Sequence, residues 1–154
     1  MGAERRLQIE VHGDHLEKLA RCSPASALAE LIWNALDADA STVHVRFVAN
    51  ALGGVDQIVV HDDGLGVGTE KVDVDTLFRR LGGSWKAKAG RTRQNRMLHG
   101  KAGEGRFKAF ALGDHVAWNT RRLEKGRVVA FGVRRELAAP LTLLAALERS
   151  SRPT

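Results

Sequence analysis

The segment Glu30-Leu-Ile-Trp-Asn34-Ala-Leu-Asp37-Ala38 constrains this chain more than any other part of its sequence. Glu30, Asn34 and Asp37 occupy positions i, i+4 and i+7 of an otherwise apolar stretch, so on an α-helix their side chains share one face. Burying such a polar stripe is costly unless hydrogen bonds or a metal ion satisfy it. The pattern therefore predicts a helix whose polar face is the floor of a site. An exposed helix face with incidental polar residues is the alternative.

Capping and periodicity signals around this segment predict the order of the other elements. Ser23-Pro24 is typical of a helix start, with Ser23 as the N-cap. Gly53-Gly54 and Lys125-Gly126 are turn signals, and alternating polarity predicts strands at 7–11, 42–48, 57–60, 115–121 and 127–134. Further helices are expected at 74–81 and 106–112. This order predicts an α+β fold, in which hairpin-linked strands back two or three helices.

The length and composition suit one globular domain. The chain has 154 residues, of which 44% are apolar and 27% are charged. Cys22 is the only cysteine, which excludes an internal disulfide and suits a reducing compartment. The first residues show no signal-peptide pattern, and no apolar run approaches the roughly 18 residues needed to span a bilayer. We expect a cytoplasmic protein with no membrane partner.

Basic residues are concentrated in one window of the chain. Ten Lys or Arg and a single acidic residue, Glu104, lie between Arg79 and Lys108, whereas the net charge of the whole chain is +6. The window is either a solvated basic loop or a surface for phosphates, whether of a nucleotide or of nucleic acid. The sequence leaves both interpretations open.

A second polar motif, Asp62-Asp-Gly64-Leu-Gly66, follows the strand expected at 57–60. Two carboxylates directly before the glycines argue against a dinucleotide-binding turn, because they would repel a pyrophosphate. A carboxylate at a strand end can instead accept a hydrogen bond from an exocyclic amine such as adenine N6. Glycines beside it would let the backbone approach a flat base closely. An ordinary Asp-Gly turn is the alternative.

A third motif, Gly100-Lys-Ala-Gly103-Glu-Gly105, opens the helix expected at 106–112. Backbone N–H groups at a helix start form an anion site, and glycines remove side chains that would block it. Lys101, Arg106 and Lys108 add positive charge. The motif is not a Walker A loop, because Arg106-Phe107 stand where that loop requires Lys and then Ser or Thr. A glycine-rich linker is the alternative.

In this order the three motifs resemble those of the Bergerat-fold (GHKL) ATPases, the superfamily of gyrase, heat-shock chaperones, histidine kinases and MutL. The resemblance covers roughly Leu7 to Arg134. Leu81-Gly-Gly-Ser84-Trp-Lys86 is similar to the Ser-x-Lys element in the lid of Morc-type ATPases, and the third motif is also closer to that branch than to gyrase. The family implies a two-layer α+β sandwich, with a mixed or antiparallel sheet backed by helices and a mobile ATP lid over about 68–99.

The resemblance implies a role for each motif in binding Mg-ATP. Glu30 would be the general base, Asn34 the Mg²⁺ ligand and Asp62 the adenine-binding carboxylate, with Gly66 beside the base. The other nucleotide contacts would come from Asp37, Ala38, Gly64, Ser84, Lys86, Gly100, Lys101, Gly103, Glu104, Gly105 and Arg106. Histidine kinases of this superfamily generally have Asn at the position of Glu30. Glu therefore favours ATP hydrolysis over phosphotransfer to histidine.

The C-terminal end departs from the family pattern. We therefore divide the chain into an ATP-binding domain at 1–136 and a tail at 137–154 that is truncated or degenerate. Hydrolysing relatives use a lysine from a following transducer domain to reach the γ-phosphate, and no such domain is evident. Thr142 lacks the Gly-Thr pairing expected of a nucleotide-contacting Thr. The implied partners are ATP, a second copy in an ATP-dependent homodimer, and the missing transducer or partner domain.

The sequence leaves three functional hypotheses. The first is an ATP-driven conformational switch that binds Mg-ATP and hydrolyses it slowly. The second is a nucleotide-binding module without useful catalysis, which the C-terminal end motivates. The third is a nucleic-acid-binding domain whose basic lid tracks phosphates.

Overall fold

The computed structural model describes residues 3–8, 13–67, 90–99, 104–136 and 142–149, and this part of the chain has an α+β fold. Its larger sheet has four strands in the order β1-β6-β5-β4, namely β1 (Ala3–Gln8), β6 (Thr142–Arg149), β5 (Arg127–Glu136) and β4 (His115–Glu124). Its smaller sheet is the hairpin of β2 (Val43–Ala49) and β3 (Val55–Asp62). All of these strand pairs are antiparallel, so the expected fold class is confirmed.

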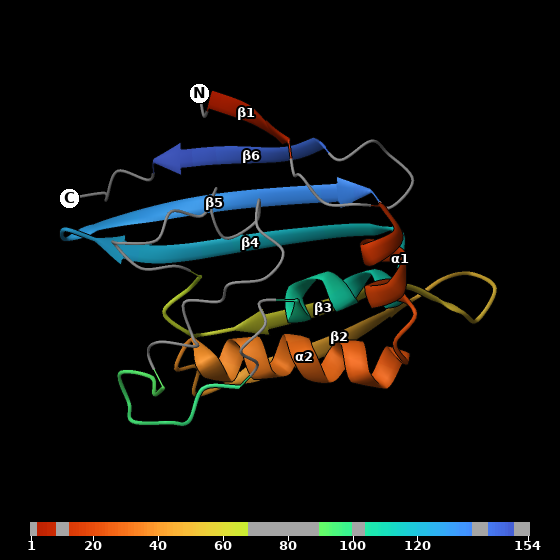
Figure 1. Cartoon of the computed structure of the whole chain (residues 1–154), viewed down its shortest axis with the longest axis horizontal. Helices are drawn as coiled ribbons and strands as arrows, with labels where there is room; N and C mark the ends of the chain where they lie inside the picture. Colours follow the sequence, from red (N-terminus) through yellow and green to blue (C-terminus); the bar gives the residue numbers. More distant parts are fainter. Residues whose placement is uncertain (1–2, 9–12, 68–89, 100–103, 137–141, 150–154) are drawn as a thin grey trace.

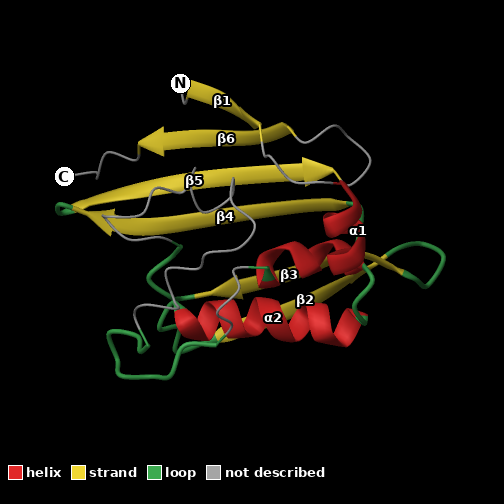
Figure 2. Ribbon diagram, viewed as in Figure 1, coloured by secondary structure: helices red, strands yellow, loops and turns green. Residues whose placement is uncertain are grey.

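Helices α1 (Gly13–Ala20) and α2 (Pro24–Asp37) and the 3-10 helix η1 (Gly105–Ala111) lie beside these sheets. In Figure 1, α2 crosses in front of the β2–β3 hairpin, while α1 and η1 lie between α2 and the β4 edge of the larger sheet. Figure 2 shows the loop formed by residues 90–99 at the C-terminal end of α2. No helix in the described ranges has the length and apolar character to cross a membrane.

Short-range signals determine both ends of α2. Ser23 is the N-cap as predicted, because its Oγ accepts a hydrogen bond from the Ser26 N–H at 3.1 Å. At the other end, Asp39 has a φ of 60°, and the two residues after Ala38 donate their N–H groups to carbonyls of the last helical turn. This is a Schellman-type end with Asp in the left-handed position that usually holds Gly.

The described core surrounds η1. Phe107 and Phe110 of this short helix are buried, and they pack against Leu19 and Ala20 of α1 and Val116 and Trp118 of β4. The rings of Phe110 and Trp118 meet edge to face, with their centroids 6.2 Å apart. Burial of each phenylalanine stabilises the fold by about 1.5–3 kcal/mol. The core therefore fixes η1, which begins at the last glycine of the third motif.

The predicted hairpins agree well with the structure. β2 and β3 pair across the Gly53-Gly54 turn, and β4 and β5 pair across a turn in which Lys125 and Gly126 have φ values of 45° and 76°. Positive φ at both central residues matches the right-handed twist of the paired strands. The strand expected at 7–11 begins earlier, at Ala3, and residues 9–12 are outside the described part.

Three other elements differ from the prediction or were not predicted. The helix expected at 106–112 is a 3-10 helix that begins at Gly105. α1 was not predicted, and neither was β6, which lies within the segment 137–154 and pairs with both β1 and β5. The helix expected at 74–81 lies outside the described residues. The proposed division of the chain at residue 136 stays a prediction.

The glycines of the second motif allow β3 to approach two other elements closely. A Cβ added at Gly64 would lie 2.9 Å from the Ala38 carbonyl oxygen at the end of α2. A Cβ added at Gly66 would overlap the Arg121 carbonyl of β4, and Gly66 also has a φ of +81°. The Val67 N–H donates to Thr120 Oγ1 at 2.8 Å in the same region. These contacts place the end of β3 between α2 and β4.

Replacing Gly66 with Ala is expected to destabilise the fold more than replacing Gly53 with Ala. Both glycines have φ near +80°, so both substitutions carry a similar backbone cost of about 1–2 kcal/mol. Only Gly66→Ala adds an overlap with β4, because no atom lies within 4 Å of a Cβ at Gly53. Urea unfolding should show an additional loss of about 1–3 kcal/mol for Gly66→Ala. Equal losses in the free energy of unfolding for the two variants would contradict the close approach of Gly66 to β4.

Candidate functional site

Glu30, in the middle of α2, has its carboxylate against η1. Its Oε1 accepts a hydrogen bond from Lys108 Nζ at 2.7 Å, and this is also an ion pair. The two side chains are partly buried, with 24% of Glu30 and 28% of Lys108 exposed. A Cβ added at Gly105 would overlap Glu30 Oε2, so the carboxylate fills the space that a side chain at Gly105 would need. Glu30 therefore contacts the C-terminal end of the third motif.

Asp37, two turns further along α2, holds the residue that precedes the third motif. Its side chain is buried, with 7% exposed, and its Oδ1 accepts a hydrogen bond from the His99 N–H at 2.9 Å. Trp33, one turn earlier on the same helix, stacks on the His99 ring with the centroids 3.9 Å apart. In the structure Asp37 anchors His99, and its predicted contact with the nucleotide stays a prediction.

The two carboxylates of the α2 stripe thus hold both ends of the third motif. Glu30 contacts Gly105 at one end, and Asp37 bonds the residue before Gly100 at the other. Residues 100–103 lie outside the described part. Asn34 lies between Glu30 and Asp37 on the helix and is partly buried. Glu30 and Asp37 therefore both lie against segments that flank or end the third motif, and the role of this polar face as the floor of a site stays a prediction.

The carboxylates of the second motif have different partners. Asp63 Oδ1 accepts hydrogen bonds from the N–H groups of Thr42 and Ser41, which lower the pKa of Asp63, with Thr42 having the largest effect. Asp62 Oδ1 accepts only a local bond from the Gly64 N–H at 2.9 Å, and no described residue donates to its Oδ2. Asp62 is exposed. Asp63 is exposed as well, but it is bonded to the connection between α2 and β2, whereas the hydrogen bond of Asp62 lies within its own turn.

The last ten residues of the expected lid form a small hairpin anchored to the end of α2. Arg91 and Met97 pair across the hairpin, and Arg96 Nη1 donates to the Ala40 carbonyl at 2.6 Å. The Gln94 N–H donates to Oδ2 of Asp39, a buried residue with 6% exposed, at 3.3 Å. This segment is therefore attached to α2 by both backbone and side-chain bonds. Residues 68–89 of the lid are outside the described part.

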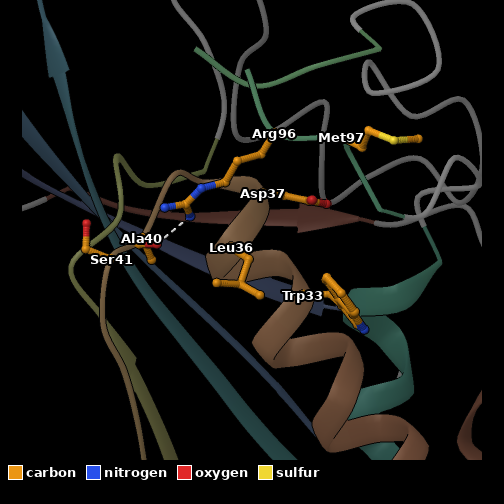
Figure 3. Close-up of a pocket in the computed structure, with 7 residues that line it drawn as sticks. All are labelled: Trp33, Leu36, Asp37, Ala40, Ser41, Arg96 and Met97. Atoms are coloured by element: carbon orange, nitrogen blue, oxygen red, sulfur yellow. Dashed lines mark hydrogen bonds between the residues drawn. The ribbon is translucent and has the colours of Figure 1, made fainter. Parts of the chain in front are cut away.

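A cavity of about 320 Å³ lies between this hairpin and α2 (Figure 3). Its lining is mainly apolar and consists of Trp33, Leu36, Asp37, Ala40, Ser41, Arg96 and Met97. Figure 3 shows the Arg96 side chain extending to the Ala40 carbonyl across one side of the cavity. Asp37 is the single predicted site residue in the lining. The cavity therefore adjoins the polar face of α2, and Glu30, Asn34 and Asp62 are not part of its lining.

Positive charge lies at the end of the third motif. The Arg106 guanidinium is 5.0 Å from the centre of the Phe107 ring, a cation–π arrangement. Burial lowers the pKa of Arg106 to about 10, so this side chain is still protonated at neutral pH. Glu104, beside it, is partly buried. Arg106 therefore contributes a fixed positive charge next to Gly105.

The second and third motifs both contact α2, the helix that carries the first motif. Ala38, at the end of the helix, accepts a hydrogen bond from the Leu65 N–H at 2.7 Å, which joins the second motif to the first. Glu30 joins the third motif to the first. The predicted site residues that lie outside the described part are Ser84, Lys86, Gly100, Lys101 and Gly103. Their roles, like the ligand contacts of the other residues, stay predictions.

The contacts made by Lys108, His99 and Asp39 were not predicted from the sequence. Lys108 was noted only as one of several positive charges. Its position three residues after Gly105 was the available signal, but only a 3-10 helix aligns the two residues directly, and the sequence did not predict that helix type. No local sequence pattern predicted the contacts of His99 and Asp39, because their hydrogen-bond partners come from segments far away in the chain.

Comparison with known proteins places this arrangement in a family. The model of the family described as "Histidine kinase-, DNA gyrase B-, and HSP90-like ATPase" matches residues 22–139. The DNA mismatch repair protein MutL of Myxococcus xanthus is 53% identical over 45 residues, which are 29% of this chain and 7% of the relative. MutL of Halalkalibacterium halodurans is 46% identical over 57 residues, 37% of this chain and 8% of the relative. The chain thus matches only a small part of these relatives' length. No solved structure gives a significant match.

Replacing Asp37 with Ala is expected to release His99 from α2. The change removes the carboxylate that accepts the His99 N–H, and loss of a hydrogen bond to a charged group costs about 1.5–3 kcal/mol in the free energy of unfolding. Asp37→Asn keeps an oxygen in the same place and should lose less. Amide hydrogen exchange measures this directly: His99 should exchange faster in Asp37→Ala than in Asp37→Asn. Unchanged protection of His99 in Asp37→Ala would rule out the anchoring role.

Proposed function

Because this chain belongs to the histidine kinase-, DNA gyrase B- and HSP90-like ATPase family, we propose that it binds Mg-ATP, hydrolyses it slowly and acts as an ATP-driven conformational switch. Membership of the family supports ATP binding at a general level. The observation that carries the finer proposal is the position of the Glu30 carboxylate against Gly105, at the end of the predicted phosphate loop. A carboxylate there can reach a water molecule beside the terminal phosphate.

The adenine would bind at the second motif. Asp62 is exposed, and its Oδ2 would accept a hydrogen bond from the exocyclic amine of adenine. The close packing of Gly64 against Ala38 and of Gly66 against β4 fixes the backbone beside Asp62. This rigidity supports the assignment, because a binding carboxylate is most effective when it is held in place before the ligand arrives.

The phosphates would lie along the third motif, whose ends are held by Glu30 and Asp37. Backbone N–H groups of a glycine-rich loop bind phosphate oxygens, and the positive charge of Arg106 favours their approach. Lys101 would add a second charge. The second motif, rather than this loop, would select a phosphate compound that carries adenine.

A magnesium ion fits the donor set of the described residues. They contain no group of three or more His, Cys, Asp or Glu that could hold a metal by themselves. Mg²⁺ in nucleotide sites needs only one or two protein oxygens, because phosphates and water supply the others. Asn34 would supply the protein oxygen from the middle of the α2 stripe. The ion would neutralise charge on the phosphates.

The hydrolytic step would use Glu30 as general base. Lys108 occupies Oε1, so Oε2 is the oxygen that would accept a proton from the attacking water. The switch would act through the lid, whose last ten residues are anchored to α2. We also propose that the protein is cytoplasmic, forms an ATP-dependent homodimer and works with a transducer or partner domain. A nucleotide-binding module without useful catalysis is the alternative.

Replacing Glu30 with Gln tests the catalytic part of the proposal. The amide keeps the size of the side chain but cannot accept a proton, so phosphate release from ATP should fall about 10²- to 10⁴-fold while ATP binding is retained. Calorimetry and a phosphate-release assay measure the two properties separately. Glu17→Gln, on the exposed surface of α1, is the matched control. Equal turnover in Glu30→Gln and the parent would show that the base is wrongly assigned, and absent turnover in the parent would favour the alternative.

Replacing Asp62 with Ala tests the adenine assignment. Loss of a hydrogen bond to a charged acceptor should weaken ATP binding about 10- to 100-fold. Asp56→Ala, an exposed acid near the start of β3, is the control and should bind ATP like the parent. Binding is measured by calorimetry with Mg-ATP. Nucleic-acid binding through the basic lid would instead be insensitive to Asp62 and would fall steeply with salt.

A further inference from the structure

The 3-10 geometry of η1 places Gly105 and Lys108 on one edge of the helix. A 3-10 helix has three residues per turn, so residues i and i+3 lie directly above one another. Gly105 is the first residue of η1 and Lys108 is three residues later. An α-helix over the same residues would rotate Lys108 away from Gly105 by about 60°. The type of helix therefore decides which side chain stands next to the position of Gly105.

The Glu30 carboxylate is held against this edge from two directions. Its Oε1 is 2.7 Å from Lys108 Nζ, and its Oε2 lies against the backbone of Gly105. The second contact is possible only because residue 105 has no side chain. No residue in the described ranges donates a hydrogen bond to Oε2. One oxygen of the carboxylate is therefore engaged, while the other faces the end of the third motif.

The charges around Lys108 keep it protonated. The hydrogen bond from Lys108 to Glu30 raises the pKa of Lys108, and the charges of Cys22 and Glu104 act in the same direction. Cys22 precedes α2 and its Sγ is 3.9 Å from the Lys108 carbonyl, while Glu104 precedes η1. Because the pKa is raised, the positive charge of Lys108 is lost only as pH rises through a value above its ordinary pKa. Lys108 therefore carries its positive charge at neutral pH.

We propose that Lys108 is a positioning residue for Glu30, and this inference rests on the proposed role of Glu30 as general base. Its ammonium group fixes Oε1, so the carboxylate has a single orientation in which Oε2 is directed toward the attacking water. A free carboxylate on a flexible side chain would sample several rotamers, and most of them would not reach the water. Gly105 completes the arrangement by leaving room for the oriented carboxylate.

Steady-state kinetics of Lys108→Met, Lys108→Arg and the parent test the positioning role. Met keeps the apolar length of the side chain and removes the charge, so kcat should fall about tenfold while KM for ATP changes less than about twofold. Arg keeps a donor and should restore most of kcat. Lys18→Met, an exposed lysine of α1, is the matched control and should behave like the parent. Thermal melting of each variant separates this effect from a loss of folding.

A second measurement does not depend on turnover. Nitrogen NMR of the Lys108 side chain should show a pKa above the ordinary 10.5 in the parent and a lower one in Glu30→Gln. A kcat in Lys108→Met equal to that of the parent, or a fall that Arg does not rescue, would overturn the inference. So would a Lys108 titration that Glu30→Gln leaves unchanged. Absence of phosphate release from the parent would instead contradict the proposed hydrolysis itself. The experiment therefore distinguishes a failure of the positioning role of Lys108 from a failure of the proposed function.

Discussion

A single helix holds both ends of one glycine loop, and the geometry of the candidate site depends on this. Glu30 and Asp37 are two turns apart on α2, about 10 Å along its axis. One contacts Gly105, and the other bonds the backbone of His99. Because an α-helix is stiff over this length, it fixes the span that residues 100–105 must bridge. The polar stripe is therefore a structural support as well as a set of candidate ligands.

The close approach of the backbone after β3 to α2 and to β4 is a second constraint on the geometry of the candidate site. Gly64 lets β3 approach the end of α2, and Gly66 lets the following segment approach β4. Asp63 reinforces this by accepting two N–H groups from the connection between α2 and β2. Asp62 then remains exposed at a backbone position that is held from two sides. Two neighbouring acids with the same chemistry thus have different hydrogen-bond donors: Asp63 bonds the connection between α2 and β2, and Asp62 bonds within its own turn.

The parts of the fold that the sequence predicted depend on short-range interactions. Ser23 as N-cap, the Gly53-Gly54 turn and the Lys125-Gly126 turn are each determined by a few consecutive residues. β6 was not predicted, because a strand in the segment 137–154 is stabilised by pairing with β1 at the opposite end of the chain. The 3-10 form of η1 was not predicted either. Its two buried phenylalanines, packed against α1 and β4, belong to contacts that no local pattern contains.

The sequence by itself determined which side chains share a face of α2, because helical periodicity places Glu30, Asn34 and Asp37 together whatever surrounds them. It also determined the order of the three motifs and, through them, the family. Only the tertiary structure decided what each side chain meets. Asp37 bonds His99, Glu30 pairs with Lys108, and Asp39 anchors the hairpin at 90–99. Each of these partners is distant in sequence, so the contact depends on the tertiary fold and no local pattern contains it.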